Sequence, residues 1–160
     1  TNDLQKELRA RFGSKRSDEL TITVSSFGFA RGILRNADLV FDMRFLRNPH
    51  WDKDLRPQTG LDDAVGAYIA EDPAYEDALS RIEDLAILLL PRYQAEGKSY
   101  VTIAFGCTGG RHRSVHVAER VGERLRKAGF SPTVAHRDLA FPSLDSVERV
   151  AAGEYGNAGE

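Results

Sequence analysis

The stretch YVTIAFGCTGGRHRSVHVAERVGERLRK, residues 100–127, decides the fold. It begins with an apolar, β-branched run of strand length at 100–105, which ends at the glycine-rich segment GCTGGRHRS, residues 106–114. Apolar side chains then recur at helical spacing, and Gly129 follows where a helix would end in a left-handed cap. The stretch therefore predicts a strand, a glycine-rich loop and a helix.

The predicted loop has the composition of an anion-binding site. At a helix start the first backbone N–H groups lack partners and the helix dipole is positive, so an anion is stabilised there if the backbone comes close. Gly109 and Gly110 permit that approach. Two hydroxyls and three basic side chains supply further donors: Thr108, Ser114, Arg111, His112 and Arg113. The simpler interpretation is a tight strand–helix turn capped by Ser114.

A cysteine-phosphatase pattern overlaps the same loop. Cys107, followed after five residues by Arg113 and Ser114, has the C-x5-R-S spacing in which a thiolate attacks phosphorus and the arginine holds the phosphoryl oxygens. Asp52 or Asp54 would then be the general acid. Cys107 also ends an apolar strand, where a lone cysteine is commonly an inert small hydrophobe. The sequence leaves both interpretations of the cysteine open.

Bulk properties indicate one globular domain. A chain of 160 residues, 41% hydrophobic and 29% charged, can bury a core, and no apolar run approaches the ~20 residues of a membrane span. The single cysteine excludes an internal disulfide and fits a reducing cytoplasm, where we expect the protein to reside. Residues 61–96 hold 2 Lys/Arg against 9 Asp/Glu, whereas residues 97–137 hold 8 against 2. The predicted anion loop thus lies in a basic segment.

The rest of the chain alternates strands with helices. Three apolar, β-branched runs predict strands: residues 20–24, 38–42 and 132–137. Periodicity predicts three more helices: residues 2–12, residues 61–70 and one beginning at Pro73. A buried stripe is expected on the last of these: Ala78, Leu79, Ile82, Leu85, Ala86 and Leu89. The alternation predicts an α/β, three-layer domain with a largely parallel sheet, followed by a weakly ordered tail at 140–160.

In a parallel sheet ligands bind beyond the C-terminal ends of the strands. We therefore expect Asp42, residues 25–28 and the glycine-rich loop to converge. Asp42 would either pair with Arg44 or accept hydrogen bonds from a sugar hydroxyl or an ammonium group. His50 lies in a turn, and Arg56 is a candidate phosphate contact. No Walker P-loop motif occurs, so we expect no ATP site in this chain, and we expect no metal site.

Five blocks occur in the order of a known family: residues 26–29, 37–46, 48–52, 55–61 and 106–114. Together they resemble the C-terminal domain of the RapZ-type RNase adapter proteins, also called the YvcJ family, over residues 1–139. The resemblance implies a phosphofructokinase-like nucleotide-binding topology. It also implies that the family's N-terminal P-loop domain, which carries ATPase and GTPase activity, is absent from this chain, so we expect no enzymatic activity in the domain.

The resemblance further implies a sensor of glucosamine-6-phosphate that binds small regulatory RNA, presents it to an endoribonuclease of the RNase E type, and forms a homo-oligomer. Six positions match the family's phosphosugar pocket: Asp42, His50, Thr108, Gly109, His112 and Arg113. Gly110 and Ser114 join this expected ligand set from the loop. The expected RNA-binding positions are Arg31, Arg44, Arg56 and Arg111. A purely structural role as an oligomerisation platform is a further possibility.

Two departures from the family pattern concern RNA. Family members that bind RNA have a basic residue after the glycine that ends the long helix, and a short basic tail. Here Phe130 follows Gly129, and the segment after Ala140 turns acidic. The resemblance therefore supports phosphosugar binding more firmly than it supports RNA binding.

Overall fold

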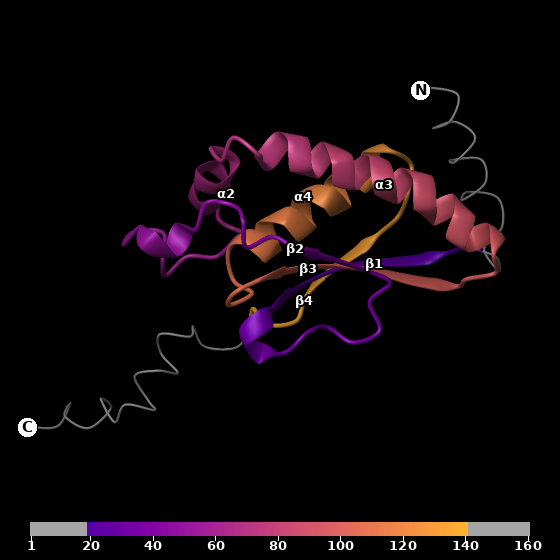
Figure 1. Cartoon of the computed structure of the whole chain (residues 1–160), viewed down its shortest axis with the longest axis horizontal. Helices are drawn as coiled ribbons and strands as arrows, with labels where there is room; N and C mark the ends of the chain where they lie inside the picture. The colour runs from indigo at the N-terminus through magenta and orange to yellow at the C-terminus, as the bar shows by residue number, and fades with distance from the viewer. Residues whose placement is uncertain (1–18, 141–160) are drawn as a thin grey trace, which may run out of the picture.

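The computed structural model describes residues 19–140, which fold around a four-stranded parallel sheet (Figure 1). The strands are β1 (Thr21–Gly28), β2 (Leu39–Asp42), β3 (Tyr100–Cys107) and β4 (Thr133–His136). Their order across the sheet is β2-β3-β1-β4. Each of the three strand pairings in this part of the chain is parallel, which confirms the predicted α/β domain with a largely parallel sheet.

Three α-helices lie on one face of this sheet: α2 (Asp63–Ala70), α3 (Tyr75–Ala95) and α4 (Arg113–Lys127). The connection from β1 to β2, which carries the short 3-10 helix η2 (Phe29–Arg31), lies on the opposite face (Figure 1). Right-handed crossovers require this arrangement, because β1 to β2 runs one way across the sheet while β2 to β3 and β3 to β4 run the other. The sheet therefore has a layer on each side.

The core lies between the sheet and the helices. Ile22, Val24, Val101 and Ile103 alternate with side chains of the other face and are almost completely buried. Helix α4 covers them through Val117, Ala118, Val121 and Leu125, and α3 adds Leu79, Ile82, Ala86 and Leu90. Each of the valine, leucine and isoleucine side chains among them contributes roughly 1.5–3 kcal/mol through burial. Helix α4 is packed against the sheet and against both α2 and α3. Its N-terminus is therefore held firmly at the C-terminal end of β3.

The structure corrects several predicted boundaries. Helix α2 begins at Asp63 and not at residue 61, α3 begins at Tyr75 and not at Pro73, and β1 extends to Gly28. The predicted stripe on α3 is wrong at Leu85, which is 39% exposed, and Ala78 and Leu89 are only partly buried. Leu90, which was not predicted, is fully buried in the core instead. The predicted helix at 2–12 and most of the predicted tail lie outside the described residues.

Residues 19–140 contain no helix with the length and apolar character that crossing a bilayer requires. The described residues contain no cis peptide bond, so the bond before Pro49 is trans.

Candidate functional site

The candidate site lies where β1 and β3 end side by side. The chain leaves β1 toward one face of the sheet and leaves β3 toward the other, which is the arrangement that opens a ligand crevice in parallel sheets. The two loops remain in contact there. The Ala30 N–H donates to the carbonyl of Thr108 at 3.1 Å, and a Cβ atom on Gly110 would come 2.5 Å from the Gly28 nitrogen. The base of the site is therefore formed by backbone atoms of the loops that follow β1 and β3.

The glycine-rich loop joins β3 to the N-terminus of α4, as predicted. Gly110 has a φ of +75°, a conformation that glycine adopts without steric cost. The helix cap is His112, and Ser114 lies inside the helix, so the predicted Ser114 cap is wrong. Ser114 is fully buried, with its hydroxyl 3.1 Å from the Cys107 sulfur. The structure thus places Thr108 at the surface of the loop and Ser114 beneath it.

Arg113 is the best-anchored cation of the site. Its side chain is only 5% exposed. One terminal nitrogen donates to the carbonyls of Arg44 at 2.5 Å and Leu46 at 3.2 Å, and the other lies 3.5 Å from the Thr108 hydroxyl. Burial lowers the pKa of Arg113, and the charges of the Cys107 thiolate form and Asp42 oppose that change. The guanidinium is therefore held rigidly beside the loop, linking it to the segment after β2.

Asp42 at the end of β2 pairs with Arg44. The Arg44 Nε donates to both carboxylate oxygens, at 2.9 and 3.1 Å, and a terminal nitrogen donates to Oδ2 at 2.6 Å. The guanidinium carbon of Arg44 also lies 4.1 Å from the centre of the Phe29 ring. The hydrogen bond from Arg44 lowers the pKa of Asp42. Both side chains are about half exposed, at 48% and 49%, so a ligand can reach this ion pair.

Two histidines border the loop on the side of the segment after β2. His112 Nε2 lies 3.1 Å from the carbonyl of Arg56, and burial lowers the pKa of His112 despite hydrogen bonds to backbone carbonyls. His50 belongs to the 3-10 helix η3 (Pro49–Trp51), and its carbonyl accepts from Arg56 Nε at 2.8 Å. The His50 ring also contacts the ring of Trp51, with 5.7 Å between centroids. Arg56 therefore contacts both histidines, which places them on the same side of the site.

The remaining expected RNA-binding positions lie farther apart. Arg111 is half-buried and donates to the carbonyl of Leu139 at 3.3 Å. Arg31 lies in the connection from β1 to β2, on the other face of the sheet from α4. There it lines an open pocket of about 830 Å³ together with Arg35 and Arg137. The structure thus brings Arg44 and Arg56 next to the loop, and it places Arg31 at the end of η2.

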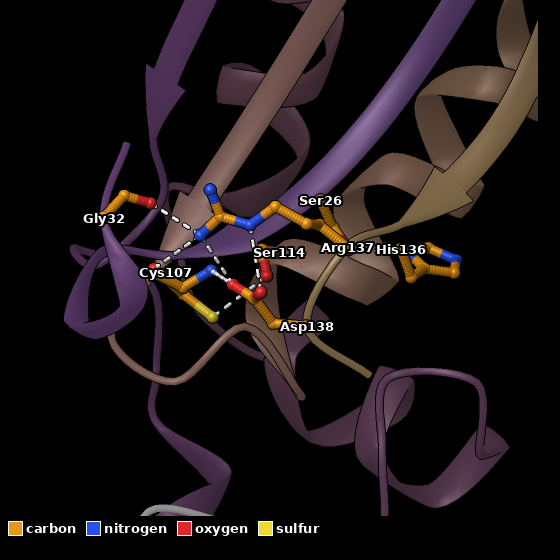
Figure 2. Close-up of polar contacts among 8 residues, drawn as sticks. Ser26, Gly32, Cys107, Ser114, His136, Arg137 and Asp138 are labelled. Atoms are coloured by element: carbon orange, nitrogen blue, oxygen red, sulfur yellow. Dashed lines mark hydrogen bonds and ion pairs between the residues drawn. The ribbon is translucent and has the colours of Figure 1, made fainter. Parts of the chain in front are cut away.

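Two residues that the sequence interpretation missed contact this site from the end of β4. Asp138 is only 2% exposed and accepts the Gly28 N–H at 2.6 Å. Arg137 donates to both Asp138 oxygens at 2.9 Å and to the carbonyl of Gly32 at 2.5 Å (Figure 2). An Arg-Asp pair directly after a parallel strand was an available signal, because ligand sites form at that edge of the sheet.

Cys107 is not presented at the loop surface. It is 3% exposed and its sulfur points at Ser114 (Figure 2). The Asp52 carboxylate caps a turn by accepting from the N–H groups of Asp54 and Leu55, at 2.9 and 3.3 Å. The geometry therefore favours the interpretation of Cys107 as a buried small hydrophobe. Within residues 19–140, no three His, Cys, Asp or Glu side chains converge as metal ligands.

Known proteins resemble this chain closely. A family model described as the RapZ C-terminal domain matches residues 20–140. A nucleotide-binding protein of Sphingopyxis alaskensis is 63% identical over 148 residues, covering 92% of this chain and 47% of the relative. One from Novosphingobium aromaticivorans is 62% identical over 150 residues, covering 94% and 49%. One from Zymomonas mobilis is 54% identical over 155 residues, covering 96% and 48%. The chain spans about half the length of these curated relatives.

Proposed function

Because the chain belongs to the family of RapZ C-terminal domains, we propose that it is a regulatory domain that binds glucosamine-6-phosphate and small regulatory RNA at overlapping sites. The observation that carries the proposal is the glycine-rich loop at the start of α4, with the Arg113 guanidinium fixed beside it. In the same proposal the domain presents RNA to an endoribonuclease of the RNase E type, forms a homo-oligomer and acts in the cytoplasm.

The phosphate would lie on the loop. Helix α4 has 15 residues and begins directly after the loop, so the positive end of its dipole lies next to the loop. Gly109 and Gly110 present backbone without side chains, and the Thr108 hydroxyl adds an exposed donor. Arg113 supplies positive charge without losing side-chain entropy on binding, because its guanidinium is already held by two carbonyls. His112, with its lowered pKa, would contribute as a neutral donor or acceptor at pH 7.

The sugar amine would be recognised by Asp42. Its lowered pKa keeps the carboxylate charged, and its partner Arg44 is half exposed. An ammonium group that reached Asp42 would compete with Arg44 for the same two oxygens. Since exposed ion pairs contribute little stability, this exchange costs little.

RNA would approach through its phosphates. Arg44 and Arg56 lie beside the loop, Arg111 is part of it, and Arg31, at the end of η2, adds a basic side chain on the other face of the sheet. A strand of RNA with one phosphate on the loop would exclude the phosphosugar, so the two ligands would compete. The name of the relatives, nucleotide-binding protein, is compatible with a nucleotide phosphate at the same position.

The test is a calorimetric titration of the chain with three sugars: glucosamine-6-phosphate, glucose-6-phosphate and glucosamine. We expect the first to bind most tightly, the second more weakly because it lacks the amine, and the third least because it lacks the phosphate. Asp42→Asn should remove the preference for the amine, whereas Asp77→Asn, which changes an exposed carboxylate on α3, should leave all three affinities unchanged.

Failure of all three sugars to bind, or equal binding of glucosamine and its phosphate, would refute the sensor part of the proposal. The RNA part is tested separately by titrating a small regulatory RNA at several salt concentrations. We expect affinity to fall steeply with salt, and glucosamine-6-phosphate to displace the RNA. An RNA affinity that is insensitive to both would refute the shared site.

A further inference from the structure

The segment that follows β4 contacts both loops of the candidate site. Asp138 binds the β1 loop, because it accepts the Gly28 N–H at 2.6 Å. The next residue binds the β3 loop, because the carbonyl of Leu139 accepts from Arg111 at 3.3 Å. Two adjacent residues thus join two loops that lie about 80 positions apart in the sequence. We call residues 137–139 the C-terminal clamp.

The clamp is itself fixed by a dense set of interactions. The Asp138 carboxylate is 2% exposed, and it is satisfied by one backbone N–H and by two hydrogen bonds from Arg137. A terminal nitrogen of Arg137 also donates to the carbonyls of Gly32, at 2.5 Å, and Gly28, at 3.3 Å. The Arg137 side chain therefore spans the β1 loop from Gly28 to Gly32. Figure 2 shows its contacts with Gly32 and Asp138.

The position of Gly28 determines that of the anion loop. A Cβ atom on Gly28 would come 2.5 Å from the Gly109 carbonyl carbon and 2.8 Å from the Gly110 nitrogen, so these backbones are in direct contact. Any shift of Gly28 is therefore transmitted to the peptide that would face the phosphate. Asp138 holds the N–H of this same glycine.

We propose that the C-terminal clamp positions the anion loop and that Asp138 is a positioning residue for phosphate binding, through Gly28. The inference rests on the proposed phosphate role of the loop. Asp138 does not touch the phosphate in this scheme. It fixes the backbone against which Gly109 and Gly110 pack, and Leu139 fixes Arg111 from the other side.

A purely structural role of Asp138 predicts a different result from a positioning role. Ser26 provides the matched control, because it also joins β1 to β4 and is fully buried, with its hydroxyl 2.6 Å from His136 Nδ1. His136 is in turn 2.7 Å from Glu119, so this chain of hydrogen bonds leads to α4 and away from the glycine loop. Ser26→Ala should therefore lower stability without changing the loop.

The experiment compares wild type, Asp138→Asn, Asp138→Ala and Ser26→Ala by two measurements. The first is hydrogen exchange of the free protein. We expect faster exchange at Gly28 and at residues 108–112 in the Asp138 variants, with exchange at the centres of β1 and β3 unchanged.

The second measurement is titration with glucosamine-6-phosphate and with inorganic phosphate. We expect affinity to fall about fivefold in Asp138→Asn, which keeps an acceptor for Gly28, and more than about tenfold in Asp138→Ala.

Ser26→Ala should retain wild-type affinity and wild-type exchange in the loop. The proposal is overturned if the Asp138 variants exchange like Ser26→Ala at residues 108–112, or if they bind phosphate as wild type does. If wild type binds neither phosphate compound, the proposed function fails, and the exchange data alone then decide whether the clamp positions the loop.

Discussion

Gly28 and Gly109 lie so close together that a Cβ atom on Gly28 would come within 2.5 Å of the carbonyl carbon of Gly109. The φ of Gly28 is −105°, which any residue can adopt, so the requirement for glycine is steric. The ends of β1 and β3 therefore form a single backbone surface. A side chain at Gly28 would push the anion loop away from the sheet.

Gly28→Ala should weaken binding of glucosamine-6-phosphate at least about tenfold and lower the free energy of unfolding by about 1–3 kcal/mol, because the added methyl group meets backbone that cannot move aside. Titration calorimetry and urea denaturation measure the two effects. Gly122→Ala is the control: its Cβ would meet the Val134 side chain, at 2.6 Å, on the covered face of the sheet. It should change stability alone, and equal affinity losses in both variants would contradict the steric account.

Arg113→Lys should weaken phosphate binding by about tenfold or more and also destabilise the fold. A lysine ammonium cannot donate simultaneously to the carbonyls of Arg44 and Leu46 and remain beside Thr108. Each carbonyl left without a donor costs about 1–3 kcal/mol. Arg81→Lys, at an exposed ion pair on α3, should leave both properties unchanged. Wild-type affinity in Arg113→Lys would show that the guanidinium geometry is not used.

Stability should fall with acid through His116. This buried histidine lies 2.7 Å from the Tyr75 hydroxyl, and burial lowers its pKa from 6.5 to about 4. Since the unfolded chain takes up the proton first, the free energy of unfolding is highest above pH 6.5 and declines as the pH falls toward about 4, by on the order of 3 kcal/mol.

Urea denaturation followed by circular dichroism at pH values from 7.5 to 4.5 measures this decline. His116→Gln keeps a polar partner for Tyr75 and has no imidazole to titrate, so its stability should depend less on pH across this range. The same pH slope in both proteins would assign the decline to other groups.

Shortening the chain should separate the clamp from the residues after it. A chain that ends after Ala140 retains Asp138 and Leu139 and should bind glucosamine-6-phosphate with full affinity. A chain that ends after His136 lacks Arg137 and Asp138 and should bind at least about tenfold more weakly, because Gly28 and Gly32 lose their side-chain partners. Comparable affinity in the two truncated chains would show that the clamp is dispensable.

Cys107 should react slowly with a thiol reagent in the folded protein and rapidly in denaturant, because its sulfur is buried beside Ser114. Cys107→Ala should bind phosphosugar as wild type does and differ only in stability. Phosphatase activity in wild type that disappeared in Cys107→Ala would overturn this interpretation and restore the C-x5-R-S loop as a catalytic site.

Local patterns were sufficient to predict the strand–loop–helix unit. The apolar run, the glycines and the helical periodicity after them correctly predicted β3 and α4. Gly129 has the expected positive φ, 103°, directly after the helix. The convergence of Asp42 with the loop followed from the parallel sheet alone. That prediction is confirmed, because Asp42 pairs in register with Gly106, where the loop begins, and the Met43 N–H donates to the Gly106 carbonyl at 2.8 Å.

Packing between distant segments could not be predicted in the same way. Helix α3 has more leucines than one face can bury, so only packing against the rest of the core decides that Leu90 is buried while Leu85 and Leu88 are exposed. Likewise, no local pattern indicates that Arg113 is held by two carbonyls from the segment after β2, or that Asp138 reaches Gly28. Both contacts depend on how the loops meet once the sheet is formed.

The contact between His50 and Trp51 has an experimental use. Trp51 is the single tryptophan of the 160 residues, it is 76% exposed, and its ring touches that of an expected ligand residue. An unlabelled chain therefore carries one tryptophan, which can be excited selectively over the five tyrosines, and this tryptophan lies beside the candidate site. Changes in its emission spectrum would report events there without signal from elsewhere in the domain.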